Sequence, residues 1–263
     1  MIIEQPTTVL VDNCINSLSD TMQGISKAQE FVWGDTIQKV NIAGYERRPM
    51  PNTDQIWKRK QIECLPTVGR IAREGKIEFY TYSELRHEAW KRPGSFPSNI
   101  IGDLFADVPF KRVDAAVERS FFFQMDISEY ISANQMIKFC KWLLDSKVAS
   151  LADLADRLGT QERYPAFLLN NLRGVRRFHD LCNGLAEKQY PDAFHLWTAE
   201  VNGIKYFLTT DQKFIRVMTE TKRLNLPCRP LSPSDLLDVL KIDERDPSEY
   251  EANQFFNVFG EPN

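Results

Sequence analysis

The sequence predicts an α/β fold with buried, parallel strands. Short apolar runs rich in β-branched and aromatic residues occur at Thr7–Val11, Ile77–Tyr82 and Ile204–Leu208. Runs of this length and composition are typical of strands that are covered on both faces, as in parallel sheets. Helical patterns separate these runs, as expected for parallel strands that are joined by helical crossovers.

A carboxylate follows each of these strands. Asp12 ends the first strand, Glu84 comes just after the second, and Asp211 follows the third. Asp192 adds a fourth acid at the start of the helix that precedes the third strand. In open α/β sheets, ligands bind outside the carboxyl ends of the strands. The sequence therefore predicts a functional site at this edge of the sheet.

The first two thirds of the chain read as mainly helical. We expect helical structure across Asp20–Gly75, with a loop at Arg47–Asp54 and a strong helix from there to Gly75. Residues 91–109 carry prolines and glycines without a sustained period, which predicts a loop. Apolar spacing over Val113–Lys188 predicts helices throughout, with Ser150 as the cap of the helix that ends at Leu158.

The last third alternates between helix and strand. Gly203, supported by Asn202, is expected to end the helix that opens at Asp192, because glycine readily adopts the left-handed conformation of a helix stop. The elements expected after the third strand are a helix over Gln212–Met218, a short strand within Cys228–Pro233, a helix over Pro233–Leu240 and a poorly packed acidic tail from Asp243.

The composition is that of an ordinary globular protein. The chain has 263 residues, of which 43% are apolar and 26% charged, with a net charge of −3. No apolar run reaches the roughly 18 residues that span a membrane, and the N-terminus does not read as a signal peptide. The five cysteines are scattered and form no C-x-x-C pair, which favours reduced thiols and a cytoplasmic location.

The net charge does not indicate nucleic-acid binding, but basic clusters occur locally. Each cluster taken alone is more commonly a solvated helix face. Lys213 and Arg216 are the exception, because they follow Asp211 within about a helical turn, and we predict that they contact nucleic acid. The other clusters are Lys58-Arg59-Lys60 beside Trp57, Arg70 with Arg73, and Arg173 with Arg176-Arg177.

Converging carboxylates need a counter-charge. A like-charge pair ~4 Å apart costs about 1 kcal/mol in water and about 4 kcal/mol at an effective dielectric constant of about 20. Either the acids stay apart or a cation balances them. Oxygen ligands without thiolate or histidine select Mg²⁺ or Mn²⁺ over zinc. Such an ion lowers the pKa of a bound water, which predicts metal-dependent hydrolysis of a phosphodiester.

Each candidate also has an ordinary structural interpretation. Asp12 also fits a polar strand end, Asp211 a turn residue, and Asp192 a helix N-cap. Glu84 competes with Glu88, one helical turn later, and with Glu78 in the strand. His195 fits a proton shuttle or a histidine packed in the core. The sequence contains no P-loop, no dinucleotide fingerprint, no zinc-protease motif and no serine-nucleophile elbow.

Four short segments together resemble the PIN-domain nucleases. They are the apolar strand that ends in Asp12, the segment Tyr82-Ser83-Glu84-Leu85, the helix start Asp192–Ala199, and the segment Phe207–Phe214. The block 191–216 matches the family most closely, whereas the segment 84–192 hardly matches it. Asn13-Cys14 follow Asp12 where the family often has a hydroxyl residue and then Asn or Ser.

The resemblance implies a parallel-sheet α/β/α sandwich and an endoribonuclease that depends on Mg²⁺ or Mn²⁺. The implied catalytic groups and metal ligands are Asp12, Glu84, Asp192 and Asp211. Asn13, Thr209 and Thr210 are expected to support them with hydrogen bonds. The implied core spans 1–90 and 189–242, with a mainly helical insertion at 91–188 and an acidic C-terminal tail at 243–263.

Two functions from different classes follow from these expectations. The first is a ribonuclease with RNA as substrate, and a role as the toxin of a toxin–antitoxin pair would add an inhibitory protein partner. The second is a PIN-like module that binds protein or RNA and whose acidic site is idle. No membrane association is expected, and self-association is left open.

Overall fold

The computed structural model describes residues 5–47, 50, 55–89, 104–123, 126–130, 133–221, 224–247 and 255–257. The described strands are β1 (Thr7–Val11), β2 (Met22–Trp33), β3 (Thr36–Arg47), β4 (Ile77–Thr81), β5 (Phe110–Arg112), β6 (Tyr206–Leu208), β7 (Arg229–Leu231) and β8 (Phe255–Asn257). The helices are α1 (Asn13–Ser19), α2 (Ile56–Arg73), α3 (Ser83–Ala89), α4 (Ile127–Tyr130), α5 (Ala133–Asp145), α6 (Val148–Leu158), α7 (Ala166–Arg173), α8 (Arg176–Cys182), α9 (Tyr190–Val201), α10 (Gln212–Arg216) and α11 (Pro233–Val239), with short helical turns η1 (Arg119–Phe121), η2 (Glu187–Gln189) and η3 (Val217–Thr221).

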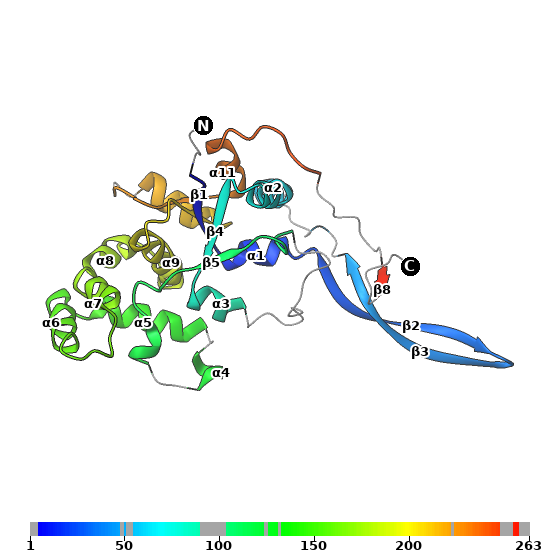
Figure 1. Ribbon diagram of the computed structural model, residues 1–263, viewed down its shortest axis with the longest axis horizontal. Helices are drawn as coiled ribbons and strands as arrows, with labels where there is room; N and C mark the ends of the chain where they lie inside the picture. The colour runs from blue at the N-terminus through cyan, green and yellow to red at the C-terminus, as the bar shows by residue number, and fades with distance from the viewer. Residues whose placement is uncertain are drawn as a thin grey trace.

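A five-stranded parallel sheet forms the centre of the protein (Figure 1). Its strand order is β5-β4-β1-β6-β7, so the chain moves outward from β1 to β5 and then returns to the other side of β1. The predicted α/β class is confirmed, as are the strands expected near residues 7–11, 77–82, 204–208 and 228–233.

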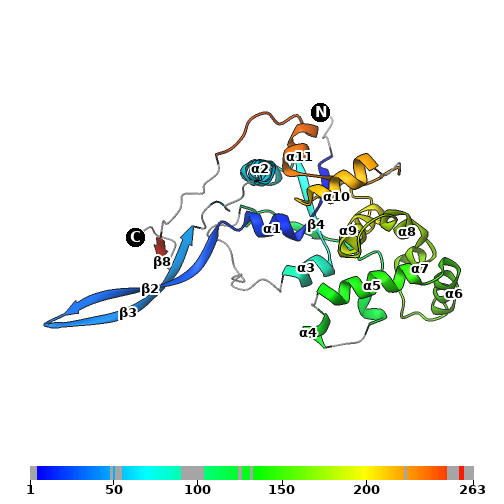
Figure 2. The ribbon, with the colours of Figure 1, turned by 180° about the vertical axis from the view of Figure 1, so that it is seen from behind.

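Helices cover both faces of this sheet because its strands are apolar on both sides. Val9 and Val11 are fully buried in a cluster with residues of α2 and α11. Leu10, between them, points the other way into a cluster with residues of α5 and α9. Two views from opposite sides show α2 and α11 on one side of the sheet and α5 and α9 on the other (Figures 1 and 2). The chain is therefore a three-layer α/β/α arrangement.

The helices of the middle of the chain belong to the same core as one face of the sheet. Phe139 of α5, Leu172 of α7 and Phe178 of α8 are fully buried in one cluster with Leu10 and Phe207 of the sheet. The helical character expected after Val113 is confirmed from Arg119 onward. The predicted cap at Ser150 is wrong: α6 begins at Val148, with Lys147 at the N-cap position.

The helical expectation for residues 20–47 is also wrong, because this segment is a β-hairpin. β2 and β3 pair antiparallel over their whole length, from Met22↔Arg47 to Trp33↔Thr36, and the ribbon extends away from the sheet (Figures 1 and 2). Gly34, with φ 60°, begins its two-residue turn, as a tight hairpin requires. Most of the ribbon is solvent-exposed, including Trp33 at 82%. Its sequence therefore lacks the alternation of apolar and polar residues that marks a half-buried strand.

The strong helix expected before Gly75 is confirmed as α2. Gly69 lies where the helix meets the carbonyl of Leu104, and a Cβ atom there would come within 2.6 Å of that oxygen. Gly203, with φ 68°, follows α9 in the expected left-handed conformation. The helix expected from Pro233 is confirmed as α11 and begins with a capping box at Ser232.

The C-terminal segment makes a few contacts with the rest of the protein where the structure describes it, although residues 243–245 and 247 are exposed. Asp246 accepts a hydrogen bond from Arg70 at 2.7 Å, and β8 pairs with β3 from Gly44↔Asn257 to Glu46↔Phe255. Residues 248–254 and 258–263 of the expected tail, residues 91–103 of the expected central loop, and residues 48–49 and 51–54 of the earlier loop lie outside the described residues.

All five cysteines are free thiols. Within the described part of the chain, none of the helices is both long and apolar enough to cross a membrane.

Candidate functional site

The strand order places a pocket where the sequence analysis expected one. The order reverses between β1 and β6, and ligands of open α/β sheets bind at the carboxyl ends of such a pair. Val11 pairs with Leu208, and the backbone N–H of Asp12 donates to the Leu208 carbonyl at 3.0 Å. A pocket of about 620 Å³ opens at this edge. Its lining residues are Asp12, Asn13, Cys14, Ser17, Gln55, Trp57, Lys58, Glu88, Asp192, Thr210, Asp211, Gln212 and Lys213.

Asp12 is held in place by two donors to the same carboxylate oxygen. Thr209 Oγ1 donates to Asp12 Oδ2 at 2.6 Å, and Cys14 Sγ donates to it at 2.9 Å. Burial and the charge of Asp12 raise the pKa of the Cys14 thiol, so the thiol stays protonated and remains a donor. Oδ1 of Asp12 accepts no hydrogen bond from the residues that the structure describes.

Cys14 was not among the predicted site residues. Thr209 makes the hydrogen bond that the sequence analysis expected near Asp12, whereas Thr210 Oγ1 donates to Cys14 Sγ at 3.2 Å. Asn13 lines the pocket. One feature of the sequence points to Cys14 as a site residue: it lies two residues after Asp12, in the first turn of the helix that begins at the strand end.

Asp211 caps the helix that follows β6. Its Oδ1 accepts from the backbone N–H of Phe214 at 2.8 Å, which satisfies one of the free donors at the start of α10. Its own N–H donates to Thr209 Oγ1 at 3.1 Å. Thr209 therefore links Asp211 to Asp12 through one hydroxyl group.

Asp192 lies in the first turn of α9 and not at its N-cap, which is Gln189. Burial raises the pKa of Asp192 to about 8, and the charges of Asp12, Asp211 and Glu88 add to this rise. The charge of His195 acts in the opposite direction. Burial, with a contribution from the acids that follow β1 and β6, therefore keeps Asp192 protonated at neutral pH.

Glu84, one of the four expected ligands, is not among the residues that line this pocket. It is buried and forms a two-fold ion pair with the buried Arg119: Nε donates to Oε1 at 3.0 Å and Nη2 donates to Oε2 at 2.8 Å. Tyr130 Oη also donates to Oε1 at 3.2 Å. Arg119 is 35 positions later in the chain, so no local pattern around Glu84 indicates this partner.

Glu88, one helical turn after Glu84, lines the pocket instead. Its Oε1 lies 3.5 Å from Nε2 of His195, and the Nδ1 of this ring shares a hydrogen bond with the hydroxyl group of Tyr82. Burial lowers the pKa of His195, but the charge of Glu88 and the hydrogen bond to it outweigh burial and raise the pKa to about 9. His195 is thus a buried cation that holds Glu88, and not a residue of the pocket surface.

The donor set of the pocket fits a hard divalent cation. Carboxylate oxygens of Asp12, Glu88, Asp192 and Asp211 line it, and the neighbouring histidine is occupied by Glu88 and Tyr82. Among the described residues, however, no three histidine, cysteine, aspartate or glutamate side chains are close enough to form a ready metal site. A cation there would offset both the burial and the carboxylate charges that raise the pKa of Asp192.

The two predicted nucleic-acid contacts separate in the structure. Lys213 lines the pocket and is exposed, with no ion pair to a described residue. Arg216 is not among the lining residues, and its guanidinium group lies 4.0 Å from the carboxylate of Glu220 on the exposed side of the helix.

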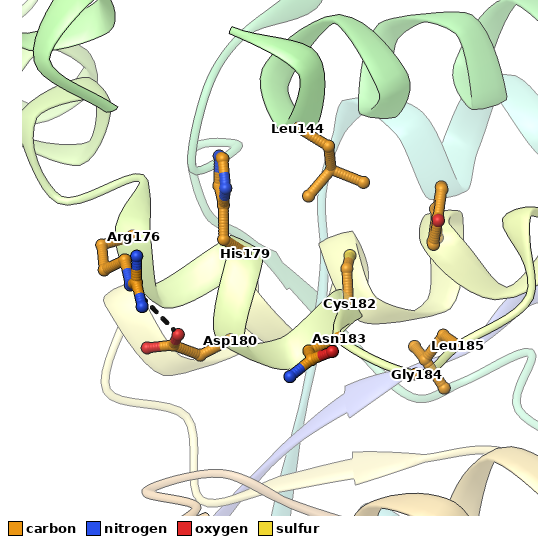
Figure 3. A pocket seen from close by; sticks show the side chains of 9 residues that line it. Leu144, Arg176, His179, Asp180, Cys182, Asn183, Gly184 and Leu185 are labelled. Carbon is orange, nitrogen blue, oxygen red and sulfur yellow. Dashed lines mark ion pairs between the residues drawn. The ribbon is translucent and has the colours of Figure 1, made fainter. Parts of the chain in front are cut away.

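A second pocket of about 380 Å³ lies between α5, α8 and the start of α9 (Figure 3). Several of its polar groups already have partners: Arg176 pairs with Asp180 at 3.3 Å, and Nε2 of His179 lies 2.9 Å from the Leu143 carbonyl oxygen. It therefore lacks the cluster of converging like charges that distinguishes the pocket at β1 and β6.

Comparisons with known proteins identify no relative: no protein-family model, no curated protein and no solved structure gives a significant match to this chain.

Proposed function

We propose that the protein is a metal-dependent phosphodiesterase, and specifically an endoribonuclease that uses Mg²⁺ or Mn²⁺. The supporting observation is the convergence of Asp12, Asp192, Asp211 and Glu88 on one pocket at the point where the strand order reverses. Burial raises the pKa of Asp192, and the charges of Asp12, Asp211 and Glu88 add to this rise, as expected for carboxylates that share one pocket. The resemblance of the segments around Asp12, Asp192 and Asp211 to PIN-domain nucleases supports the same reaction.

When bound, the ion would activate a water and neutralise charge on the scissile phosphate. The side chains have separate tasks. Asp12 and Asp211 would ligate through the oxygens that Thr209 and Phe214 leave free. Asp192 would lose its proton on binding the cation, and Glu88 would be oriented by His195. Lys213, which lines the pocket and is exposed, would hold the phosphate of the substrate.

Cleavage of single-stranded RNA in Mn²⁺, Mg²⁺ or EDTA tests this proposal. Asp211→Asn is the informative variant, because asparagine caps helices as well as aspartate does and only the charge is lost. Asp153→Asn, on the exposed side of α6, is the matched control for loss of one negative charge. We expect metal-dependent cleavage by the wild type and the control, and a loss of at least about 100-fold in Asp211→Asn, the size of effect seen when one charge-stabilising group is removed from an active site.

Calorimetry with Mn²⁺ separates the remaining outcomes. Mn²⁺ binding without cleavage would retain the metal site and reject RNA as the substrate. Neither binding nor cleavage would reject the enzyme in favour of a module with an idle acidic pocket. The proposed toxin role adds its own test: expression of the wild type would arrest growth, and expression of Asp211→Asn would not.

A further inference from the structure

The acidic pocket has a second kind of lining that the metal chemistry does not use. Gln55, Trp57 and Lys58 come from the start of α2, and Lys213 comes from α10. These side chains bring an aromatic ring and two amines to a pocket that otherwise consists of carboxylate, amide, thiol and hydroxyl groups. The sequence places Lys58 and Lys213 more than 150 positions apart, so only the fold brings them to one pocket.

Both amines are available to an anion. Neither Lys58 nor Lys213 forms an ion pair with a residue that the structure describes, although carboxylates line the same pocket. Elsewhere, Lys27, Lys76 and Lys111 each pair with a nearby glutamate. Two amines that line the same pocket as four carboxylates fit a phosphate chain that runs over a bound cation.

Trp57 differs from the tryptophans that serve the core. Trp197 is 1% exposed and stacks on Phe178, and Trp142 stacks on Phe139. Trp57 is half-buried and lines the pocket, and it makes no ring contact with another aromatic residue of the described chain. A half-buried tryptophan that lines the same polar pocket as two unpaired amines provides a surface on which a nucleobase can stack.

We propose that this pocket binds single-stranded nucleic acid, with one base stacked on Trp57 and the adjoining phosphates contacted by Lys58 and Lys213. This inference rests on the proposed function, because it takes the ligand of the acidic pocket to be a nucleic acid. A duplex keeps its bases stacked on one another, so the ring of Trp57 selects an unpaired strand. The phosphate beside the stacked base is then delivered to the carboxylates of the pocket.

Binding is measured on the full chain in EDTA, where no metal-dependent cleavage occurs. A fluorescein-labelled single-stranded RNA and its duplex serve as probes at low salt. In EDTA the acidic cluster lowers the affinity of all variants for RNA, so the readout is the ratio of each variant's Kd to the wild-type Kd. We expect Trp57→Ala to raise the Kd for the single strand about tenfold, the effect of losing one stacked base, and Trp57→Phe to retain most of the affinity. Trp33→Ala, at the exposed tip of the hairpin, is the control and leaves the Kd unchanged.

Two further readouts identify the contacts. Single-stranded RNA quenches the tryptophan fluorescence of the wild type, and this quenching is lost in Trp57→Phe but kept in Trp33→Phe. Lys58→Gln lowers the slope of log Kd against log salt concentration by about one, as expected for one phosphate contact. Lys60→Gln, on an exposed position of the same helix, is the matched control and does not change the slope.

The outcomes keep this inference apart from the proposed function. An unchanged Kd in Trp57→Ala, or a duplex that binds as tightly as the single strand, overturns the inference even if the protein cleaves RNA. Binding that depends on Trp57 in a protein that neither binds Mn²⁺ nor cleaves supports the inference and rejects the proposed nuclease.

Discussion

The buried pair of Glu84 and Arg119 leads to the sharpest prediction, because it separates a carboxylate of the core from a carboxylate of the pocket in the same helix. Their side chains are 3% and 1% exposed, and Arg119 also lies over the ring of Tyr130, 3.8 Å from its centroid. Nη1 of Arg119 has no hydrogen-bond partner among the described residues. The positive charge of the buried guanidinium group is therefore balanced mainly by the carboxylate of Glu84.

Glu84→Gln removes the negative charge and leaves the arginine buried with a neutral partner. Breaking a buried pair from one side costs about 3–5 kcal/mol, which is a large part of the 5–15 kcal/mol that stabilises a typical domain. Glu88→Gln, in contrast, leaves behind a histidine that can lose its proton, which a buried arginine cannot do, and Glu88 itself is 25% exposed; we therefore expect a smaller loss of stability than in Glu84→Gln. Urea unfolding at neutral pH measures both values.

Mn²⁺ titration of the same two variants gives the opposite ranking. At a temperature where both are folded, Glu84→Gln is expected to bind Mn²⁺ like the wild type, and Glu88→Gln to bind it more weakly. The double change Glu84→Leu with Arg119→Met recovers much of the lost stability, because an apolar pair of similar size needs no charge compensation. Wild-type stability in Glu84→Gln together with lost Mn²⁺ binding would refute this assignment and restore Glu84 as a ligand.

The pH dependence of stability gives an independent check on this pair. Burial acts to raise the pKa of Glu84, but the neighbouring His87 and the hydrogen bonds from Arg119 outweigh it and lower the pKa below its usual value. A lowered pKa in the folded state contributes stability above the unfolded-state value of about 4.3, and this contribution is lost as the pH falls through the folded-state value. The stability difference between wild type and Glu84→Gln should therefore shrink in acid.

Other predictions concern the pocket and the hairpin. Because the pKa of Asp192 is about 8, this group lowers the stability of the metal-free protein increasingly as the pH rises from about 4 to 8. In EDTA, Asp192→Asn should therefore be more stable than wild type, and the difference should be larger at pH 8.5 than at pH 5. An equal difference at both pH values would contradict this prediction. Asp211→Ala should lose about 1 kcal/mol in urea unfolding, whereas Asp211→Asn keeps the cap on Phe214 and should unfold like wild type. A Cβ at Gly44 would collide with the ring of Phe255 and the carbonyl of Phe256; Gly44→Ala should therefore release β8 and speed limited proteolysis there, and unchanged cleavage would argue against the pairing.

Short-range patterns in the sequence were sufficient for the sheet and for part of the pocket. The runs that became β1 and β6 are mainly apolar on both faces, and burial between two helical layers satisfies such a pattern. Asp12 and Asp211 could be placed because each directly follows a strand, and parallel strands end at one edge. These inferences need only the residues on either side of each strand end.

The errors occurred where the deciding contacts are distant or where burial leaves no pattern. The hairpin of β2 and β3 is exposed on both faces, so its residues carry no clean alternation, and their intrinsic tendency was read as helical. Glu84 and Glu88 are equivalent candidates by spacing, and only the position of Arg119, 35 residues after Glu84, assigns one to the core and leaves the other for the pocket.

Sequence alone thus determined the class of the fold and the edge of the sheet where acidic groups gather, because strand burial and strand ends are local properties. The tertiary structure decided which carboxylates share the pocket, that Cys14 and Thr209 hold Asp12, and that Trp57 joins them from α2. Those features depend on which segments pack together across long stretches of chain, and a contact between distant residues leaves no spacing rule in a single sequence.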